Sequence, residues 1–233
     1  MPDFSIRSTK KELLDRTDIP FSDIKRNMLE LEIINTRLGG HAITLKGIKE
    51  IYTQSKSSLS VCEIGCGGGD NLKYIAAWCS RNNIPVNLTG IDINKDCIEY
   101  AKENCGKISG IEFITSNYSQ VIFTDKKPDI IFSSLFCHHL NDEQFVEMLG
   151  WSKQNSKIGF FINDLHRHPL AYYSIKILSR LFSKSYLVKN DAPLSVKRGF
   201  KKTEIENLLQ KAGIRNFSIH WKWAFRWLIL IKH

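Results

Sequence analysis

A run of glycines and two acidic side chains in the first half of the chain could together hold a nucleoside. The largely apolar run Leu59–Ile64 contains Glu63, and glycines follow it at positions 65, 67, 68 and 69. Glycine has no Cβ, so the backbone of such a turn can lie close to a ligand. Asp92 follows Gly65 by 27 residues, in a second apolar run. A carboxylate there can accept hydrogen bonds from both hydroxyls of a ribose.

Histidines that could act as a general base follow two later apolar runs. His138 and His139 come after residues 128–135, and His166 comes after residues 157–165. Imidazole titrates near neutral pH and can accept a proton from a weakly acidic hydroxyl. We therefore predict His138, His139 and His166 as catalytic candidates, with His138 as the first choice. A reaction that needs only alignment of the reactants, without a protein base, is the open alternative.

Two arginines and a tyrosine are candidates for contacting a second substrate. Arg167 and Arg198 could each clamp a carboxylate or another anionic group, because a guanidinium binds such groups in a bidentate manner. The alternative for Arg167 is an ion pair with Asp164 that fixes the loop. Tyr173 belongs to an apolar-rich segment that could roof an apolar pocket.

Composition indicates one ordinary domain with extra segments. The chain has 233 residues, of which 42% are apolar and 24% are charged, so it can bury a real core. The six cysteines have no C-x-x-C spacing, so we predict no metal site and expect small buried thiols in a reducing cytoplasm. The sequence contains no run of 18 apolar residues, so no membrane span is predicted. The first residues also lack an apolar signal region. We therefore expect a cytoplasmic protein.

The net charge of +9 is concentrated in the C-terminal part. Residues 150–233 contain 16 Lys and Arg against 4 Asp and Glu, whereas residues 1–149 contain 17 against 20. A basic part can attract nucleic acid, anionic lipid or an acidic substrate, or it can simply be a solvated face.

Apolar runs alternate with segments of helical spacing, and this alternation predicts a parallel sheet with helices on both faces. Ligands of such sheets bind beyond the carboxyl ends of the strands. Polar residues stand at these ends in all five predicted strands: Glu63, Asp92, Asn117, His138 and Asp164. Helices are predicted at residues 72–80, 95–104, 142–152 and 203–212, and strands also at residues 214–221 and 225–232.

Three further segments carry their own expectations. Residues 8–16 predict a short polar helix, and a longer helix with Ser22 as its cap runs to Gly39 and Gly40. Residues 169–182 predict an apolar-rich helix with basic residues on its polar side, which could lie on a membrane surface, roof a pocket or face the core. Residues 190–200 predict a loop.

The glycine run distinguishes between two kinds of nucleotide site. The dinucleotide pattern G-x-G-x-x-G fails because Asp70 takes its last position. The pattern (D/E)-x-G-x-G-x-G fits without a gap at Glu63, Gly65, Gly67 and Gly69. On this motif the chain resembles the class I S-adenosylmethionine-dependent methyltransferases, and most closely the quinone-biosynthesis-type and other small-molecule methyltransferases.

The resemblance, which covers residues 58–165, implies a cofactor and its binding residues. The cofactor would be S-adenosyl-L-methionine, and the product S-adenosyl-L-homocysteine. Asn117 stands where the family usually has an aspartate that contacts the adenine amino group, and its side chain still offers a carbonyl oxygen. The implied cofactor-binding residues are Glu63, Gly65, Cys66, Gly67, Gly69, Asp92, Ile93, Asn117, Tyr118 and Leu135.

The resemblance also implies the fold: an α/β, Rossmann-like protein with a seven-stranded, mostly parallel sheet and an antiparallel C-terminal hairpin. Residues 1–56 would form an N-terminal helical cap that acts as a lid. Residues 57–233 would form the methyltransferase domain, with a helical insertion at residues 166–200.

The implied function is methyl transfer, most simply O-methylation, to a small aromatic, quinone-like, polyketide or lipid-like acceptor in secondary metabolism. A nucleic-acid methyltransferase and a non-catalytic protein that binds S-adenosylmethionine are the alternatives. Residues 133–136 lack the Asn/Asp-Pro-Pro-Tyr/Phe motif that grips a flipped base, which disfavours nucleic acid. Peripheral membrane contact through residues 169–182 is a further expectation, and the chain would be a monomer or homodimer.

Overall fold

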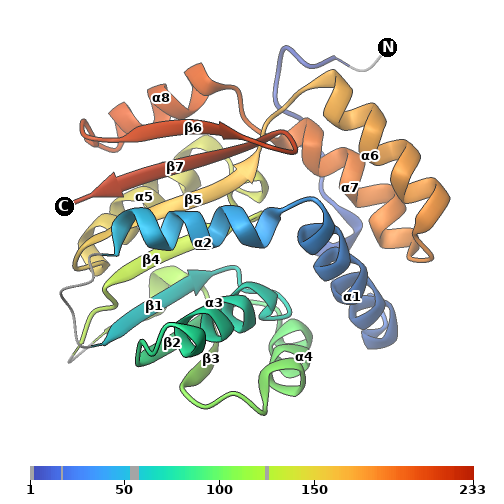
Figure 1. Cartoon of the computed structure of the whole chain (residues 1–233). Coiled ribbons are helices and arrows are strands. Elements are labelled where there is room, and N and C mark those ends of the chain that lie inside the picture. Colours follow the sequence, from blue (N-terminus) through green and yellow to red (C-terminus); the bar gives the residue numbers. More distant parts are fainter. Residues whose placement is uncertain (1–2, 17, 53–57, 124–125) are drawn as a thin grey trace.

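The central feature of the fold is one mixed β-sheet. The computed structural model describes residues 3–16, 18–52, 58–123 and 126–233, and these residues form a sheet of seven strands (Figure 1). The strand order is β3-β2-β1-β4-β5-β7-β6, with parallel pairing from β3 to β5 and antiparallel pairing of β7 with both β5 and β6. The strands are β1 (Leu59–Ile64), β2 (Val86–Asp92), β3 (Ile111–Thr115), β4 (Ile130–Ser134), β5 (Gly159–Leu165), β6 (Ser218–Lys222) and β7 (Arg226–Lys232). The predicted fold class is confirmed.

Helices cover both faces of the sheet because successive strand residues point to opposite sides. In β5, Phe160 and Ile162 join a core with α5 (Asp142–Asn155) and α8 (Lys202–Lys211). Phe161 joins the opposite core, with α2 (Gly40–Ile51), α3 (Asp70–Arg81) and α4 (Lys95–Cys105). The central strands β1, β4 and β5 are buried along nearly their whole length, as expected of a sheet covered on both sides.

Three helices and a short turn lie beyond the carboxyl ends of the parallel strands. They are η1 (Leu13–Asp15), α1 (Phe21–Arg37), α6 (Pro169–Phe182) and α7 (Tyr186–Arg198). In Figure 1 these elements form a helical group beside one end of the sheet, where α6 packs on α7 and α7 packs on α1 and η1. They therefore surround the edge at which the predicted polar residues meet.

The N-terminal helices do not form one lid. Helix α2 packs on the sheet, with Gly47 directly against the ring of Phe161, so it belongs to a covering layer. Of the described N-terminal elements, α1 and η1 belong instead to the helical group beyond the strand ends. The predicted boundary between residues 56 and 57 falls within residues 53–57, outside the described part of the chain.

Local expectations fail where tertiary contacts decide the backbone. The helix predicted at residues 8–16 is only the single turn η1, and α1 begins after Pro20 without a cap from Ser22. The loop predicted at residues 190–200 is largely helix α7, which contains Pro193. Asp191 does not make a turn there, because its carboxylate accepts hydrogen bonds from the backbone N–H groups of Leu13 (2.8 Å) and Leu14 (3.0 Å).

Candidate active site

A cavity of about 990 Å³ lies at the carboxyl ends of the strands, between the sheet and the helical group. Its walls come from the glycine loop, the ends of β2 and β4, η1, α1, α6, α7 and the turn between β6 and β7. Nine predicted site residues line it: Glu63, Gly65, Cys66, Gly67, Asp92, Ile93, Leu135, His138 and His139. The structure therefore brings both predicted functions, nucleoside binding and proton transfer, to a single cavity.

The glycine loop has a backbone that other residues would strain. Gly65 has φ +69°, and a Cβ there would lie 2.4 Å from the Phe136 ring, which no side chain tolerates. Gly67 has φ +50°, and its N–H donates a 2.9 Å hydrogen bond to Asp92 Oδ2. The other oxygen of Asp92 accepts from Asn94 N–H at 2.9 Å. The loop thus fixes the Asp92 carboxylate at the cavity wall.

Two buried charged side chains on the cavity wall each keep one unused hydrogen-bonding atom. Glu63 Oε1 accepts from Asn71 Nδ2 (2.8 Å), and Arg226 Nη2 donates to Asn35 Oδ1 (2.9 Å). Among the described residues, Glu63 Oε2 and Arg226 Nη1 are buried atoms without a partner. Burial raises the pKa of Glu63 well above its ordinary value and lowers the pKa of Arg226 to about 10. Such atoms cost free energy unless a ligand satisfies them.

Arg226 and Asn35 are functional candidates that the sequence did not indicate. Asn35 Nδ2 also donates to Asp70 Oδ2 (3.3 Å), and His41 Nε2 lies 2.7 Å from the same oxygen. This network connects α1, α2, β7 and the first residue of α3 around one end of the cavity. Its residues are far apart in sequence, so no local motif marks them.

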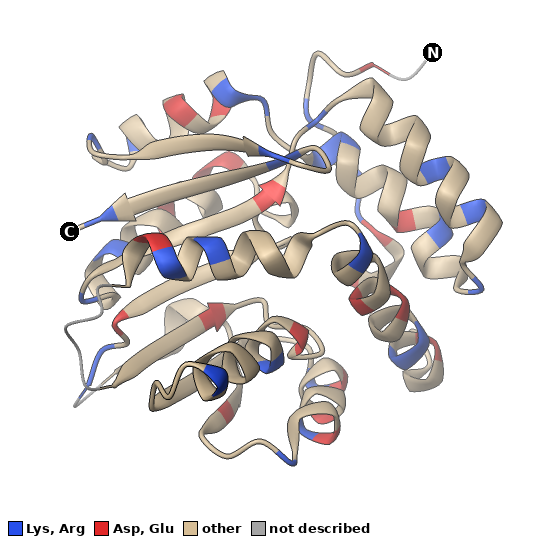
Figure 2. Ribbon diagram, in the orientation of Figure 1, with Lys and Arg blue, Asp and Glu red and all other residues tan. Residues whose placement is uncertain are grey.

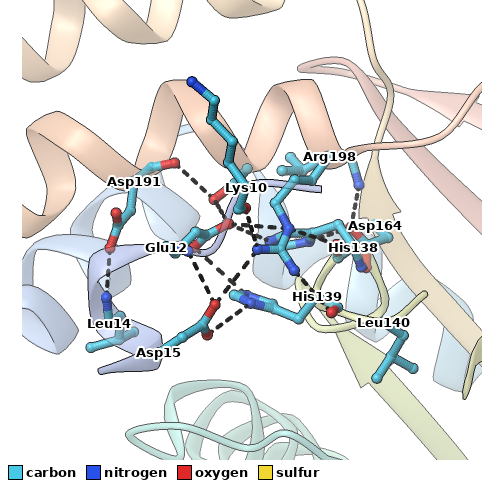
Figure 3. Close-up of polar contacts among 12 residues, drawn as sticks. Lys10, Glu12, Leu14, Asp15, His138, His139, Leu140, Asp164, Asp191 and Arg198 are labelled. Atoms are coloured by element: carbon cyan, nitrogen blue, oxygen red, sulfur yellow. Dashed lines mark hydrogen bonds and ion pairs between the residues drawn. The ribbon is translucent and has the colours of Figure 1, made fainter. Parts of the chain in front are cut away.

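At another part of the cavity, His138 and Asp164 form a buried pair (Figure 3). His138 Nδ1 lies 2.8 Å from Asp164 Oδ1, and the backbone N–H of His138 donates a hydrogen bond to Asp164 Oδ2 at 3.3 Å. Burial alone would raise the pKa of Asp164, but the adjacent imidazole and hydrogen bonds hold it below its ordinary value. With Asp164 accepting the Nδ1 proton, the lone pair of His138 lies on Nε2.

Glu12 is a second residue that the sequence did not indicate. One of its oxygens lies 3.7 Å from His138 Nε2 and the other 3.8 Å from His139 Nε2. Ser195 Oγ donates to Glu12 Oε1 at 2.8 Å, and burial raises the pKa of Glu12 to about 6. Glu12 comes from the N-terminal segment, so only the tertiary fold places it beside the two histidines.

Arg198 positions this cluster and does not line the cavity. Its guanidinium donates to the backbone carbonyls of His138 (3.0 Å), His139 (2.9 Å) and Lys10 (2.8 Å). It therefore connects α7 and the N-terminal segment to the loop after β4. These hydrogen bonds leave its expected role as an anion clamp without support.

The other predicted substrate and catalytic residues lie outside the cavity lining. Arg167 is fully buried and donates to Glu204 (3.0 Å) and to the Gly199 carbonyl (2.6 Å), so it neither clamps a ligand nor pairs with Asp164. His166 packs against Trp227, and burial lowers its pKa to about 4. Tyr173 is exposed on α6.

The predicted adenine-side residues also lie beyond the lining. Asn117 caps η2 (Tyr118–Gln120), where its Oδ1 accepts from Ser119 N–H at 3.1 Å. Tyr118 packs edge-on against Phe136 and Trp151. Gly69, also outside the lining, is the N-cap of α3 and has φ +75°. This left-handed backbone favours glycine whether or not a ligand binds.

Comparisons with known proteins agree with this geometry. Residues 61–159 match a family described as "Methyltransferase domain". The chain is similar to a fatty-acid O-methyltransferase of Mycolicibacterium smegmatis, with 34% identity over 71 residues, which is 30% of this chain and 24% of that protein. It is also similar to the mitochondrial ubiquinone biosynthesis O-methyltransferase of Saccharomyces cerevisiae, with 27% identity over 128 residues, 54% of this chain and 39% of that protein. The matches thus span well under half of either relative.

A solved structure extends the likeness to the whole fold. A SAM-dependent methyltransferase from Aquifex aeolicus superposes with a TM-score of 0.65 and 19% identity, covering 92% of this chain and 99% of the other. Identity this low establishes the fold only. The family match, the strand order and the glycine loop agree: residues 61–159 match a methyltransferase domain, and the chain has the fold of the class I S-adenosylmethionine-dependent methyltransferases.

Proposed function

We propose that this protein transfers a methyl group from S-adenosyl-L-methionine to a hydroxyl of a small aromatic, quinone-like, polyketide or lipid-like acceptor. The observation that carries the proposal is a pair of buried atoms without hydrogen-bond partners, Glu63 Oε2 and Arg226 Nη1, on residues that line the same cavity as His138, which is paired with Asp164.

The residues of the cavity fit S-adenosylmethionine. Its amino-acid end carries an ammonium and a carboxylate, which are the partners that Glu63 Oε2 and Arg226 Nη1 lack. Its ribose hydroxyls suit the carboxylate of Asp92, whose oxygens retain lone pairs beside their backbone donors. The bound cofactor would supply an electrophilic methyl group on a sulfonium.

The protein's own part in the reaction is to align the acceptor, exclude water and remove a proton. His138 Nε2 is suited to accept the hydroxyl proton, because Asp164 holds the proton on Nδ1 and stabilises the imidazolium that forms. His139 lies beside it and shares Glu12 as a neighbour.

The cavity wall favours an apolar acceptor. Side chains from η1, α1, α6 and α7 give it an apolar lining: Leu14, Ile19, Leu31, Ile175, Leu178 and Val188. Such a lining binds rings and alkyl chains and leaves specificity to a few polar groups. The two O-methyltransferases reported above, for a fatty acid and in ubiquinone biosynthesis, have names that fit an acceptor of this kind.

The outer face of helix α6 favours contact with the surface of a membrane, and apolar acceptors partition into membranes. Its inner side lines the cavity, whereas Leu170, Ile177, Leu181 and Phe182 are each more than half exposed. Lys176 and Arg180 accompany them, and α6 contains no acidic residue (Figure 2). This combination is typical of helices that lie on anionic bilayers. None of the described helices has the length and apolarity needed to cross one.

The test is transfer of labelled methyl from S-adenosylmethionine into cell extract, followed by separation into organic-soluble, nucleic-acid and protein fractions. We expect label in the organic fraction and none from an Asp92→Ala variant. Label in nucleic acid or protein would overturn the acceptor class. Cofactor binding without any labelled fraction would favour the non-catalytic alternative.

A further inference from the structure

Three potential metal-ligand atoms converge on one point of the cavity wall. One ring nitrogen of His138, one ring nitrogen of His139 and a carboxylate oxygen of Glu12 all lie within 4.8 Å of one another (Figure 3). The contacts from Glu12 to the two imidazoles measure 3.7 Å and 3.8 Å, too long for hydrogen bonds. Ligand atoms about 2.1 Å from a shared ion lie roughly 3.0 to 3.5 Å apart, so the three side chains would have to close by up to about 1–2 Å around an ion, which rotation of the two imidazoles and the carboxylate can supply.

The outer contacts of both histidines are those of metal ligands. His138 Nδ1 lies 2.8 Å from Asp164, and His139 Nδ1 lies 3.3 Å from Asp15. A metal-bound histidine characteristically donates its second ring N–H to a carboxylate, which directs the free lone pair at the ion. With each Nδ1 directed at a carboxylate, each Nε2 is on the side of Glu12, 3.7 Å from one of its oxygens for His138 and 3.8 Å from the other for His139.

The local charge also favours a cation. Three carboxylates, those of Glu12, Asp15 and Asp164, surround the two imidazoles. The nearby cation is Arg198, at 3.9 Å from Glu12 and 3.6 Å from Asp15, and its guanidinium also donates to backbone carbonyls. The Arg198 guanidinium is therefore shared between two of these carboxylates and three backbone carbonyls. Glu12 and His138 are buried, and His139 is partly open to solvent, so an ion here would keep free positions.

We propose that Glu12, His138 and His139 bind one divalent transition-metal cation, such as Zn²⁺, Fe²⁺, Mn²⁺ or Co²⁺. Two imidazoles and one carboxylate are the ligand set these ions prefer, and the three come from one side and leave the cavity side open. The ion's role rests on the proposed function, although its binding does not. An acceptor hydroxyl at the open side would lose its proton to water and keep the electron pair on oxygen, so that His138 serves as a ligand in the loaded protein and as a base without the ion.

The test is binding of Co²⁺ to the full chain after treatment with a chelator, followed by visible absorption and by elemental analysis after gel filtration. We expect about one Co²⁺ per chain. His139→Ala and Glu12→Gln should each lower the affinity at least tenfold. His220→Ala removes an exposed histidine of β6 that does not line the cavity, and it should bind like the parent.

Two outcomes would overturn the proposal: no Co²⁺ bound by the parent chain, or equal affinity in the parent, His139→Ala and Glu12→Gln. Glu12 also holds the N-terminal segment through Ser195, so His139→Ala guards against a folding effect of the Glu12 variant. Calorimetric binding of S-adenosylmethionine is measured in parallel. If the parent chain binds S-adenosylmethionine and transfers methyl but binds no Co²⁺, the proposed function stands and the metal site is refuted. If it binds Co²⁺ with the expected loss in the variants but transfers no methyl, the metal site stands and the proposed function is refuted.

Discussion

The two functional parts of the cavity are assembled in different ways. The nucleoside part is local: Glu63, the glycines and Asp92 lie within thirty residues of each other, on adjacent parallel strands. The part proposed to activate the acceptor hydroxyl, called the hydroxyl part below, contains residues from four distant segments: Glu12, His138, Asp164 and Arg198. A local motif is visible in a sequence, whereas a constellation assembled by the fold is visible only in part. The following predictions test whether the two parts also work independently.

The largest effect is expected from Gly65→Ala. The residue's φ of +69° and the 2.4 Å approach of a Cβ to Phe136 would force the loop to move, at a cost of about 1–3 kcal/mol from the backbone alone. We expect loss of measurable S-adenosylmethionine binding by calorimetry and a lower melting temperature. The matched control is Gly150→Ala in α5, where a Cβ meets no atom and helix propensity should stabilise by up to about 1 kcal/mol. Unchanged cofactor affinity in Gly65→Ala would refute the role given to this loop.

The second prediction concerns His138→Ala. Removing the group that activates the hydroxyl should lower the rate of methyl transfer by about 10²–10⁴-fold. S-adenosylmethionine affinity should stay within about twofold of the parent, because His138 contacts Asp164 and Glu12 and none of the nucleoside residues. Transfer assays and calorimetry on the same preparation separate the two readouts. A matched loss in both would mean that the parts of the cavity are coupled.

The sequence predicted the residues of the local motif better than the residues that the fold brings together from distant segments. The motif predicted Glu63, Gly65, Gly67 and Asp92, because residues of a strand, a loop and the next parallel strand must meet at one edge. Strand periodicity also predicted the position of His138. It could not predict Glu12 or Arg226, because their placement depends on how η1 packs on α7 and on the antiparallel register of β7.

The surroundings of the two arginines predicted as substrate residues have a related cause. Arg167 and Arg198 are arginines near strand ends, a pattern that fits an anion clamp. Each instead satisfies backbone carbonyls of converging loops, and Arg167 also pairs with Glu204. Which groups a long cationic side chain reaches is decided by the tertiary structure. The fold class, in contrast, follows from alternating patterns that every strand and helix repeats.

The third prediction is the pH dependence of cofactor binding. Burial raises the pKa of Glu63, so the free protein holds its proton to higher pH than an exposed glutamate would. An ammonium prefers the ionised carboxylate, so binding should release a proton and affinity should rise as pH rises towards the raised pKa. Glu63→Gln should lower affinity by about 10–100-fold and abolish this slope. Calorimetry in buffers of different ionisation enthalpy counts the protons. Glu112→Gln is the matched control, because Glu112 is an exposed residue of β3.

The same carboxyl group gives a stability test with a fixed sign. Because the folded-state pKa of Glu63 lies above the unfolded one, folding takes up a proton over the interval between them. The contribution of Glu63 is therefore full below its unfolded pKa and is lost as pH rises towards its folded pKa. Relative to Glu63→Gln, the parent should lose stability across that interval in denaturant titrations. A parent that gains stability over it would show that Glu63 is ionised in the fold.

The smallest effect is expected at the outer face of α6. Ile177→Glu places a charge on an apolar side chain that is more than half exposed and does not line the cavity, so folding and cofactor affinity should not change. The fraction of protein that floats with anionic liposomes should fall several-fold, and added salt should reduce binding of the parent because Lys176 and Arg180 contribute. Ile122→Glu is the matched control, since Ile122 is equally apolar and highly exposed but lies outside α6. If both variants float like the parent, α6 is only the wall of the cavity, and an apolar acceptor must reach the hydroxyl part through solvent rather than from a bilayer.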